Sequence, residues 1–450
     1  MYNRSMNVSL AKALRVSSSP CLAFIGAGGK TTAMFQLARE LQAPVIVTAT
    51  SHLGTWQTGF ADRHIIAGTP APLEELEHGL RGVILITGEI EGERTQPIHA
   101  DLLNWLQQFC GYHAIPLLIE ADGSRQKPLK AWEEHEPPIP SFVEQVVHVV
   151  GLHGMGKPLI DDYVHRAEFF SRLSGLDLQE TITPDSLLRV LAHPEGAIKN
   201  MPFGARKAVL LNQADTPELQ SLAQGLSQPL LAFHDSVIIS SLKQEKIFAV
   251  HERIAGIVLA AGESTRYGQP KQLLDWKGEP FVRAVAKTAL QGGLSPVLVI
   301  TGADAGRVES TLHDLDVVVI RNEHWKTGQA GSIRAGIEFL VKPSSPKTGG
   351  AIFLLADQPQ LTGSVLHALL EKHATQLYPV VAPMVMDRRA NPVLFDRATF
   401  SGLLTLEGDV GGRAVFHNHH VEYLPWHDDR LLLDVDTPEM YQRLIADDSL

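Results

Sequence analysis

The sequence GIVLAAGESTRYGQPKQLL, at residues 256–274, constrains the fold of this chain more than any other stretch. Its first six residues are small or aliphatic, which indicates a buried strand of a parallel sheet. The strand ends at Gly262, and the loop after it carries two cations, Arg266 and Lys271. Glycine lets a backbone approach a phosphate closely, while backbone N–H groups and fixed cations neutralise its charge. We therefore predict a strand followed by a loop that binds a polyphosphate.

The whole pattern, L-A-A-G-x-S-x-R-x-G-x-x-K-x-L-L, is more specific than a lone glycine loop, which is also compatible with a solvated basic pair. It resembles the signature of nucleotidyltransferases, and among them the molybdenum cofactor cytidylyltransferases. The resemblance implies a Rossmann-like (GT-A-like) α/β domain that uses CTP and Mg²⁺. It assigns catalysis to Arg266, Lys271 and Asp357. It assigns nucleotide binding to Leu259, Ala260, Ala261, Gly262, Ser264, Gly268, Thr301, Asn322 and Ser332.

Acidic residues near two apolar segments predict the Mg²⁺ site. Asp357 follows the apolar run of LLADQP, where a hard divalent ion needs a carboxylate. Asp434 and Asp436 would share one face of a strand at 431–435. One of them is expected to complete the site with Asp357. We favour Asp434 as the ligand and Asp436 as the cap of the following helix.

Apolar segments alternate with amphipathic helices after residue 250, which predicts a mostly parallel sheet covered on both faces. We expect strands at 256–261, 296–301, 317–320, 351–355, 379–383 and 431–435. Ligands of such sheets gather at the C-terminal ends of the strands. The motifs RRANP and GDVGGR resemble the acceptor side of the same family, although Ala390 stands where the family usually has glycine. The implied acceptor residues, otherwise solvated loop positions, are Asn391, Pro392, Asp409 and Arg413.

A second glycine loop, GAGGKTT, lies between an apolar segment at 21–25 and a predicted helix at 34–41. This is the order of a P-loop, in a form shorter than Walker A, and it resembles the ATP loop of Mur-type ligases. The alternative is a glycine-rich turn with a surface lysine. In a P-loop, Lys30 neutralises phosphate and Thr31 reaches Mg²⁺. We expect ATP or GTP to contact Gly26, Gly28, Gly29, Lys30, Thr31, Thr32 and Asp122.

Three further strand ends of the N-terminal half carry polar residues. Glu120 and Asp122 follow an apolar strand as in a Walker B site, but they alternate along it, so one is structural. His52 ends another strand. The motif LNQAD resembles the base-reading N-K-x-D of GTPases, with Gln213 in place of lysine. The competing interpretation makes Asp215 or the next threonine a helix cap.

Motifs spread from residue 21 to 215 together resemble the YqeC-type accessory proteins of selenium-dependent molybdenum hydroxylases. They are GAGGKTT, EADGSRQKPLK, HEPPIP, GLHGMGKPL, HRAE and LNQAD. The resemblance implies that the functional residues of this half are Lys30, Thr31, Asp122, Lys130, His135, His165 and Arg166.

Length and composition set the remaining limits. A chain of 450 residues predicts two or three domains, and we place one boundary near residue 250, giving units 1–250 and 251–450. The net charge of −11 argues against a nucleic-acid surface or an anionic membrane as partner. Two cysteines exclude a disulfide framework. Without an apolar stretch of membrane-spanning length, a cytoplasmic location is expected.

The combined hypothesis is a two-domain enzyme that transfers CMP from CTP to the phosphate of molybdopterin, or molybdenum cofactor, and releases pyrophosphate. The dinucleotide product would serve a molybdenum hydroxylase. Ala261 favours CTP, because guanylyl relatives commonly have glycine there. The alternatives are a chaperone that delivers the cofactor to a hydroxylase subunit, with the P-loop as a switch, and a guanylyl or sugar nucleotidyltransferase.

Overall fold

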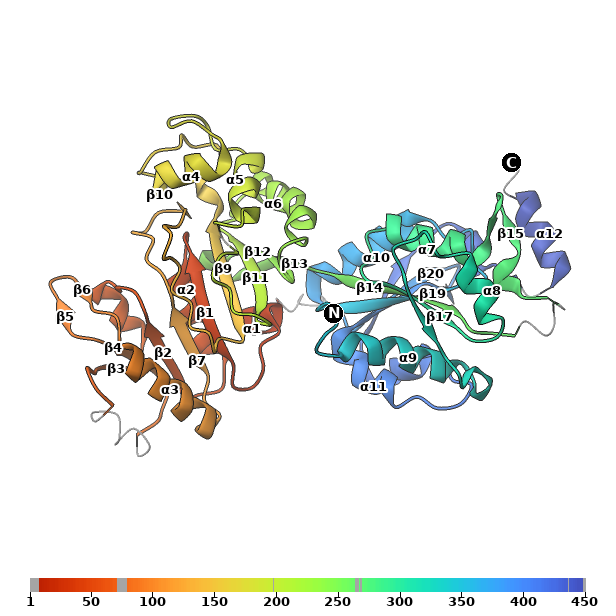
Figure 1. The fold of residues 1–450 in the computed structure, drawn as a ribbon, viewed down its shortest axis with the longest axis horizontal. Coiled ribbons are helices and arrows are strands. Elements are labelled where there is room, and N and C mark those ends of the chain that lie inside the picture. Colours follow the sequence, from red (N-terminus) through yellow and green to blue (C-terminus); the bar gives the residue numbers. More distant parts are fainter. Residues whose placement is uncertain are drawn as a thin grey trace. The chain divides into compact units, whose positions relative to one another are not determined.

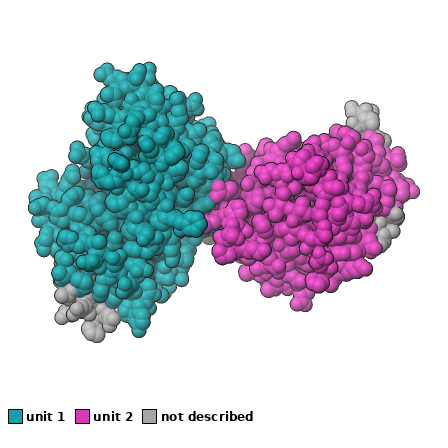
Figure 2. Space-filling model, viewed as in Figure 1, with its two compact units in different colours: residues 1–251 teal, residues 252–450 magenta. Residues whose placement is uncertain are grey.

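The computed structural model describes residues 8–70, 79–196, 198–263, 267, 269–435 and 437–447. Backbone contacts divide the chain into two compact units, residues 1–251 and 252–450 (Figure 2). Each unit is built on its own mostly parallel sheet with helices packed against it, so the predicted α/β class is confirmed (Figure 1). None of the helices in the described part of the chain has the length and hydropathy that a membrane crossing needs.

The first unit is a nine-stranded sheet in the order β13-β12-β11-β9-β1-β7-β2-β4-β3. The central strands are buried along their whole length, as their continuous apolar sequences require in a sheet covered on both sides. The strands are β1 (Cys21–Gly26), β2 (Val45–Ala49), β3 (Arg63–Ile66), β4 (Val83–Thr87), β7 (Leu117–Glu120), β9 (Gln145–Gly151), β11 (Arg206–Asn212), β12 (Ser236–Ser241) and β13 (Lys246–Glu252). Two small sheets pair β5 (Ile90–Glu91) with β6 (Arg94–Thr95) and β8 (Leu129–Lys130) with β10 (Val164–His165).

The helices of the first unit follow amphipathic patterns and use the expected start signals. Helix α2 begins directly after Gly29, whose φ of 123° suits glycine, and it buries its apolar face on the sheet. Helix α6 begins at Pro217 with the Thr216 hydroxyl as its cap. The helices are α1 (Leu10–Leu14), α2 (Lys30–Glu40), α3 (Ala100–His113), α4 (Ala167–Ser174), α5 (Pro184–Ala192) and α6 (Pro217–Leu230).

The second unit is an eight-stranded sheet in which β18-β17-β14-β19 are parallel and β22 runs antiparallel beside β19. Strand β20 lies beyond β22 and pairs with β21 and β23. The strands are β14 (Ile254–Ala260), β17 (Val297–Thr301), β18 (Val318–Arg321), β19 (Gly350–Leu355), β20 (Val380–Val385), β21 (Arg388–Arg389), β22 (Val393–Asp396) and β23 (Val421–Pro425). A small hairpin joins β15 (Asp275–Trp276) and β16 (Glu279–Pro280).

Helices cover both faces of the second sheet, and the apolar residues of β14 alternate between the two cores. Helices α7 and α10 pack on one face with Val258, and α9 and α11 pack on the other with Ile257 (Figure 1). The helices are α7 (Phe281–Gln291), α8 (Ala305–Ser310), α9 (Gln329–Val341), α10 (Gly363–Gln376), α11 (Phe400–Leu404) and α12 (Pro438–Asp447). This arrangement leaves the C-terminal ends of β14 and β19 side by side, because these strands pair in parallel.

One predicted strand is wrong. Residues 431–435 form no strand, and a short 3₁₀ helix covers Asp429–Leu432 instead. The apolar residues there are buried four positions apart, with Leu431 against the sheet core and Val435 beside Phe281. Leu431 and Val435 are therefore buried without forming a strand, and a short apolar run does not distinguish such packing from a strand. The strands β22 and β23 were not predicted.

Candidate active site

A cavity of about 820 Å³ lies at the C-terminal ends of β14 and β19 in the second unit. Its walls come from the L-A-A-G strand end, the segment before α9 and the turn after β19. The lining residues include Leu259, Ala260, Ala261, Gly262, Tyr267, Lys271, Gln272, Trp325, Lys326, Gln329, Ser332, Asp357 and Asp409. Of the predicted nucleotide residues, Ser264, Gly268 and the catalytic Arg266 lie outside the described residues.

The glycine loop is held by Gln272, a cavity-lining residue that was not predicted from the sequence. Its side chain is buried, and its Nε2 donates hydrogen bonds to the carbonyls of Ala260 (3.3 Å) and Gly262 (2.9 Å). These hydrogen bonds satisfy two carbonyl oxygens that would otherwise repel an anion at the loop. The pattern K-Q-L-L contains the glutamine, but nothing in the sequence shows that its amide turns back onto the loop.

Two of the predicted catalytic residues meet in the cavity. Lys271 Nζ lies 3.0 Å from Asp357 Oδ2, and both side chains keep access to the cavity. Lys271 comes from the short 3₁₀ helix Lys271–Leu273, whereas Asp357 follows β19. A cation and a carboxylate thus stand together at the end of the phosphate loop. This is the charge arrangement that a triphosphate and its divalent ion require.

The second predicted metal residue, Asp434, is not among the residues that line this cavity. Asp434 is exposed and accepts a hydrogen bond from Gln358 Nε2 at 2.7 Å. The reasoning that Asp434 and Asp436 share a strand face is wrong, because the segment is not a strand, and Asp436 lies outside the described residues. Among the residues described, no three carboxylate, histidine or cysteine side chains cluster in a way that would hold a metal.

The N-terminal end of α9 closes the cavity opposite Lys271. Gly328 has φ 110°, and a Cβ on it would lie 2.3 Å from the Gly408 carbonyl, so only glycine fits there. The Gln329 N–H is 3.4 Å from Asp409 Oδ1, which places this predicted acceptor residue in the cavity wall. Ser332 also lines it.

Other predicted residues are placed outside the cavity wall. Asn322 is buried and donates to Ser332 Oγ at 3.1 Å, so it supports the wall from behind. The hydroxyl of buried Thr301 donates to Glu309 Oε1 at 3.3 Å. Arg413 is exposed on the 3₁₀ helix Gly412–Asn418. Asn391 and Pro392 are likewise absent from the lining.

A second cavity, of about 760 Å³, lies at the GAGGKTT loop of the first unit. Its lining includes Gly28, Gly29, Lys30, Thr31, Thr32, His52, Gln57, Arg94, Glu120, Ser124, Arg125, Lys127, His165 and Gln213. Gly28 is packed tightly, because a Cβ on it would lie 2.3 Å from Gly151 Cα. The predicted phosphate loop and its neighbouring strand ends therefore surround one space.

Thr31 and Glu120 meet in this second cavity. The Thr31 hydroxyl donates to Glu120 Oε2 at 2.8 Å and accepts from Gln57 Nε2 at 2.8 Å. Lys30 Nζ donates to the Gly26 carbonyl (2.8 Å) within its own loop. A hydroxyl and a carboxylate next to a P-loop lysine are the groups that bind a divalent ion with a triphosphate. Gln57 was not predicted, and its sequence context contains no signal for it.

Asp122 has a different surrounding and does not line the cavity. Both of its oxygens accept from the Gly26 N–H at 3.1 Å, and Oδ2 accepts from the Trp132 indole at 2.8 Å. Burial alone would raise the pKa of Asp122, but the ion pairs with Lys30 (3.4 Å) and Lys130 (3.1 Å) outweigh it and lower the pKa. Asp122 is the structural member of the Glu120–Asp122 pair.

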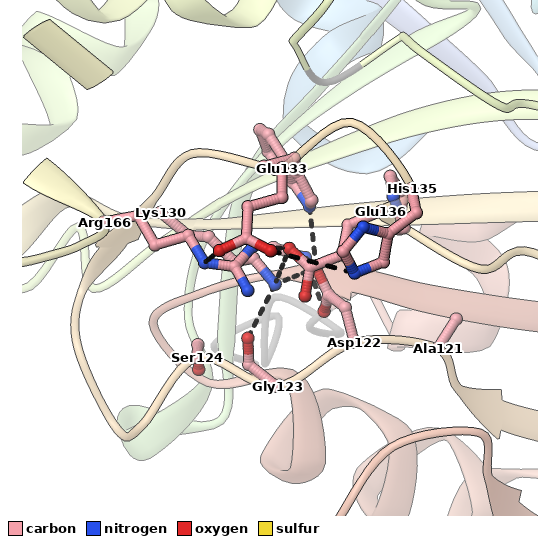
Figure 3. Close-up of polar contacts among 12 residues, drawn as sticks. Ala121, Asp122, Gly123, Ser124, Lys130, Glu133, His135, Glu136 and Arg166 are labelled. Atoms are coloured by element: carbon pink, nitrogen blue, oxygen red, sulfur yellow. Dashed lines mark hydrogen bonds and ion pairs between the residues drawn. The ribbon is translucent and has the colours of Figure 1, made fainter. Parts of the chain in front are cut away.

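Figure 3 shows the charge cluster around Asp122, which includes Lys130, Glu136 and Arg166. Lys130 donates to the Gly123 carbonyl at 2.7 Å, and Glu136 lies between Lys130 and Arg166, with which it forms ion pairs. Burial lowers the pKa of Lys130 to about 8. His135 is instead exposed and pairs only with Glu133 among the contacts of the described residues. The cluster therefore holds the backbone at Gly123, and its Glu136 also lines the second cavity.

Acid is expected to destabilise the first unit through His148 on β9. Burial holds the pKa of this imidazole at about 3, whereas the unfolded chain binds the proton near 6.5. Below pH 6.5 the unfolded state therefore carries more protons, and stability falls as the pH falls towards 3, by up to about 1.4 kcal/mol per pH unit. Urea unfolding at pH 7 to 4 measures this slope. A His148→Phe variant should flatten it, and an equal slope in both proteins would contradict the assignment.

Comparison with known proteins follows the division into units. The model of the YqeC protein family matches residues 22–168, and that of the MobA-like NTP transferase domain matches residues 256–423. The uncharacterized protein YqeC of Escherichia coli K12 is 33% identical over 219 residues, covering 46% of this chain and 82% of that protein. The purine catabolism protein PucB of Bacillus subtilis 168 is 31% identical over 199 residues, covering 42% of this chain and 94% of that protein. The chain belongs to both families, one in each unit.

Further proteins are similar to the second unit. A probable molybdenum cofactor guanylyltransferase of Bacillus cereus G9842 is 31% identical over 140 residues, covering 30% of this chain and 64% of that protein. The crystal structure of Rv0371c from Mycobacterium tuberculosis is 30% identical and covers 43% of this chain and 98% of that one, with a TM-score of 0.38. The MobA-like unit is a nucleotidyltransferase, which confirms the predicted enzyme class. The YqeC resemblance is confirmed for the first unit.

Proposed function

We propose that the MobA-like unit transfers CMP from CTP to the phosphate of molybdenum cofactor, giving molybdopterin cytosine dinucleotide and pyrophosphate. The observation that carries the proposal is the Lys271–Asp357 pair at 3.0 Å in the cavity beneath the L-A-A-G loop. The cofactor part is supported by the names of relatives, some of which are molybdenum cofactor guanylyltransferases. The product would serve a molybdenum hydroxylase.

The chemistry needs little from the protein beyond positioning and charge. An oxygen of the acceptor's phosphate monoester attacks the α-phosphorus of CTP, the bond from that phosphorus to the bridging oxygen of the β-phosphate breaks, and pyrophosphate leaves. Because the attacking phosphate is already an anion, no strong general base is required. Lys271 neutralises charge on the departing pyrophosphate, and the loop amides at Ala261 and Gly262 hold the phosphates.

The residues fit a magnesium ion that binds together with the nucleotide. Mg²⁺ commonly takes one or two protein carboxylates and completes its shell with substrate phosphates and water. Asp357 is a partly exposed carboxylate that faces the cavity, and it would hold the ion. Bound there, Mg²⁺ would neutralise charge on the phosphates.

For the YqeC unit we propose binding of a magnesium–nucleoside triphosphate at GAGGKTT. Lys30 begins α2 directly after the glycines, so the phosphates would meet the amide end of an eleven-residue helix. Thr31 and Glu120, already 2.8 Å apart, would hold the ion. The proposal thus replaces Asp122, predicted from the sequence, by Glu120 as the carboxylate at this site.

Pyrophosphate release by the full chain tests the transfer. Purified protein is incubated with Mg²⁺, molybdenum cofactor and CTP, GTP or ATP in turn. We expect release with CTP that depends on the cofactor. Release with GTP alone would favour the guanylyl reaction of the Bacillus relatives. No release with any nucleotide would contradict the transfer and favour a cofactor carrier.

A further inference from the structure

The strand end at 212–215 of the first unit lies beside the phosphate loop but has no role in the function described so far. β11 is separated from β1 only by β9, which places the two strand ends about 10 Å apart. Asn212 Nδ2 donates to the Gly28 carbonyl at 2.8 Å, so the two ends are tied together. A Cβ on Gly29 would lie 2.5 Å from that Nδ2, so this tie requires the glycine. Gln213 continues into the lining of the phosphate cavity.

Asp215 is not used as a helix cap. The Thr216 hydroxyl caps α6 by accepting from the Leu219 N–H at 3.4 Å. The Asp215 carboxylate instead accepts from Ser241 Oγ at 2.5 Å and pairs with His153 Nε2 at 2.7 Å. Its side chain remains 21% exposed, and each carboxylate oxygen has a further lone pair beyond the one used by Ser241 or His153.

The end of β12 fixes this carboxylate in place. Asn212 Oδ1 accepts from the Leu242 N–H at 3.0 Å and from Ser240 Oγ at 3.3 Å. Adjacent serines, Ser240 and Ser241, therefore hold Asn212 and Asp215 respectively. An acceptor that is oriented by its neighbours discriminates among ligands better than a mobile surface charge, because little ordering is needed on binding.

We propose that the first unit selects guanine nucleotides and that Asp215 recognises the base. Guanine presents two adjacent donors, N1–H and the 2-amino group, to which an ionised carboxylate accepts in a bidentate manner. Adenine presents an acceptor, N1, beside its amino group, and a carboxylate cannot donate to it. His153, which is 53% exposed, would move aside as the base arrives. The proposal rests on triphosphate binding at GAGGKTT, which would put the base beside β11.

Calorimetric titration of the full chain with magnesium-bound GTPγS and ATPγS tests this selectivity. The second unit has its own nucleotide site, so each titration is repeated with Lys30→Ala, and only the lysine-dependent binding is compared. We expect GTPγS to bind roughly ten- to a hundredfold more tightly than ATPγS. Equal affinities, or tighter ATPγS binding, would overturn guanine selectivity alone. Absence of any lysine-dependent binding, in a folded variant, would overturn triphosphate binding as well.

An Asp215→Asn variant gives a test that does not rely on loss of binding. Xanthine keeps the N1–H donor of guanine but carries a carbonyl oxygen at C2 in place of the amino group. The N1–H can donate to the oxygen of a carboxamide, and the C2 carbonyl can accept from its NH₂ group. We expect the variant to lose about tenfold or more in GTP affinity and to bind xanthosine triphosphate at least tenfold better than the unaltered chain. Asp161→Asn, on an exposed turn of the same unit, is the matched control. Unchanged preference in Asp215→Asn would contradict base recognition by this residue.

Discussion

Replacing Lys271 by alanine is expected to lower the rate of pyrophosphate release from CTP by about 10²–10³-fold. The ammonium group lies 3.0 Å from Asp357, in the cavity where the departing pyrophosphate gains negative charge. A group that stabilises this charge mainly in the transition state affects kcat more than substrate binding. Single-turnover release of pyrophosphate, at saturating CTP and cofactor, measures the effect directly.

Lys277→Ala provides the control for this experiment. Lys277 is exposed on the turn between β15 and β16 and packs over the Trp276 ring, away from the cavity lining. Its loss should leave the rate within about twofold, because a surface charge outside the site contributes little. The Lys271 variant should fold normally, since the remaining Asp357 is partly exposed. A Lys271→Ala protein with near-normal kcat would remove the residue from the mechanism.

Asp122→Ala is expected to destabilise the first unit by about 3–5 kcal/mol. The substitution leaves the ammonium groups of Lys30 and Lys130 buried, with side-chain exposures of 3% and 0%, and without their shared carboxylate. It also removes the acceptor for the Gly26 N–H and the Trp132 indole. Urea unfolding measures the loss. Hydrogen exchange of peptides within residues 21–40 shows whether the loss of stability occurs in this unit.

The matched substitution is Asp62→Ala in the same unit. Asp62 also pairs with a cation, Arg39, at 2.6 Å, but both side chains are nearly half exposed. Removing an exposed ion pair should cost no more than about 1 kcal/mol, because water solvates both partners. Similar losses for the two variants would show that the buried cluster does not determine the stability of the phosphate loop.

Local sequence was sufficient for the parts of both sites that come from one continuous segment. The runs GIVLAAGESTRYGQPK and CLAFIGAGGKTT each contain an apolar strand, a glycine turn and a cation, and the strands form at 254–260 and 21–26. The same is true of Asp357, which directly follows the apolar strand β19. In each case the continuous run of apolar residues and the conformational freedom of glycine act over a few neighbouring residues.

Choices between similar residues depended on contacts between distant segments. Glu120 and Asp122 are equivalent in sequence, but only Glu120 lies in the cavity with Thr31, while Asp122 turns inward to Gly26 and Trp132. The 431–435 segment looked like a strand because it is apolar, yet it forms no strand, and Leu431 and Val435 pack into two separate apolar clusters.

The sequence by itself determined that the chain contains two glycine loops at the ends of buried parallel strands, each with a cation for phosphate. Only the tertiary structure decided which carboxylates accompany them and that Ser241 orients Asp215. The physical reason is the range of the interactions. Backbone conformation and apolar periodicity act within a segment, whereas a hydrogen bond or ion pair between segments far apart in the chain exists only once the sheet has brought their ends together.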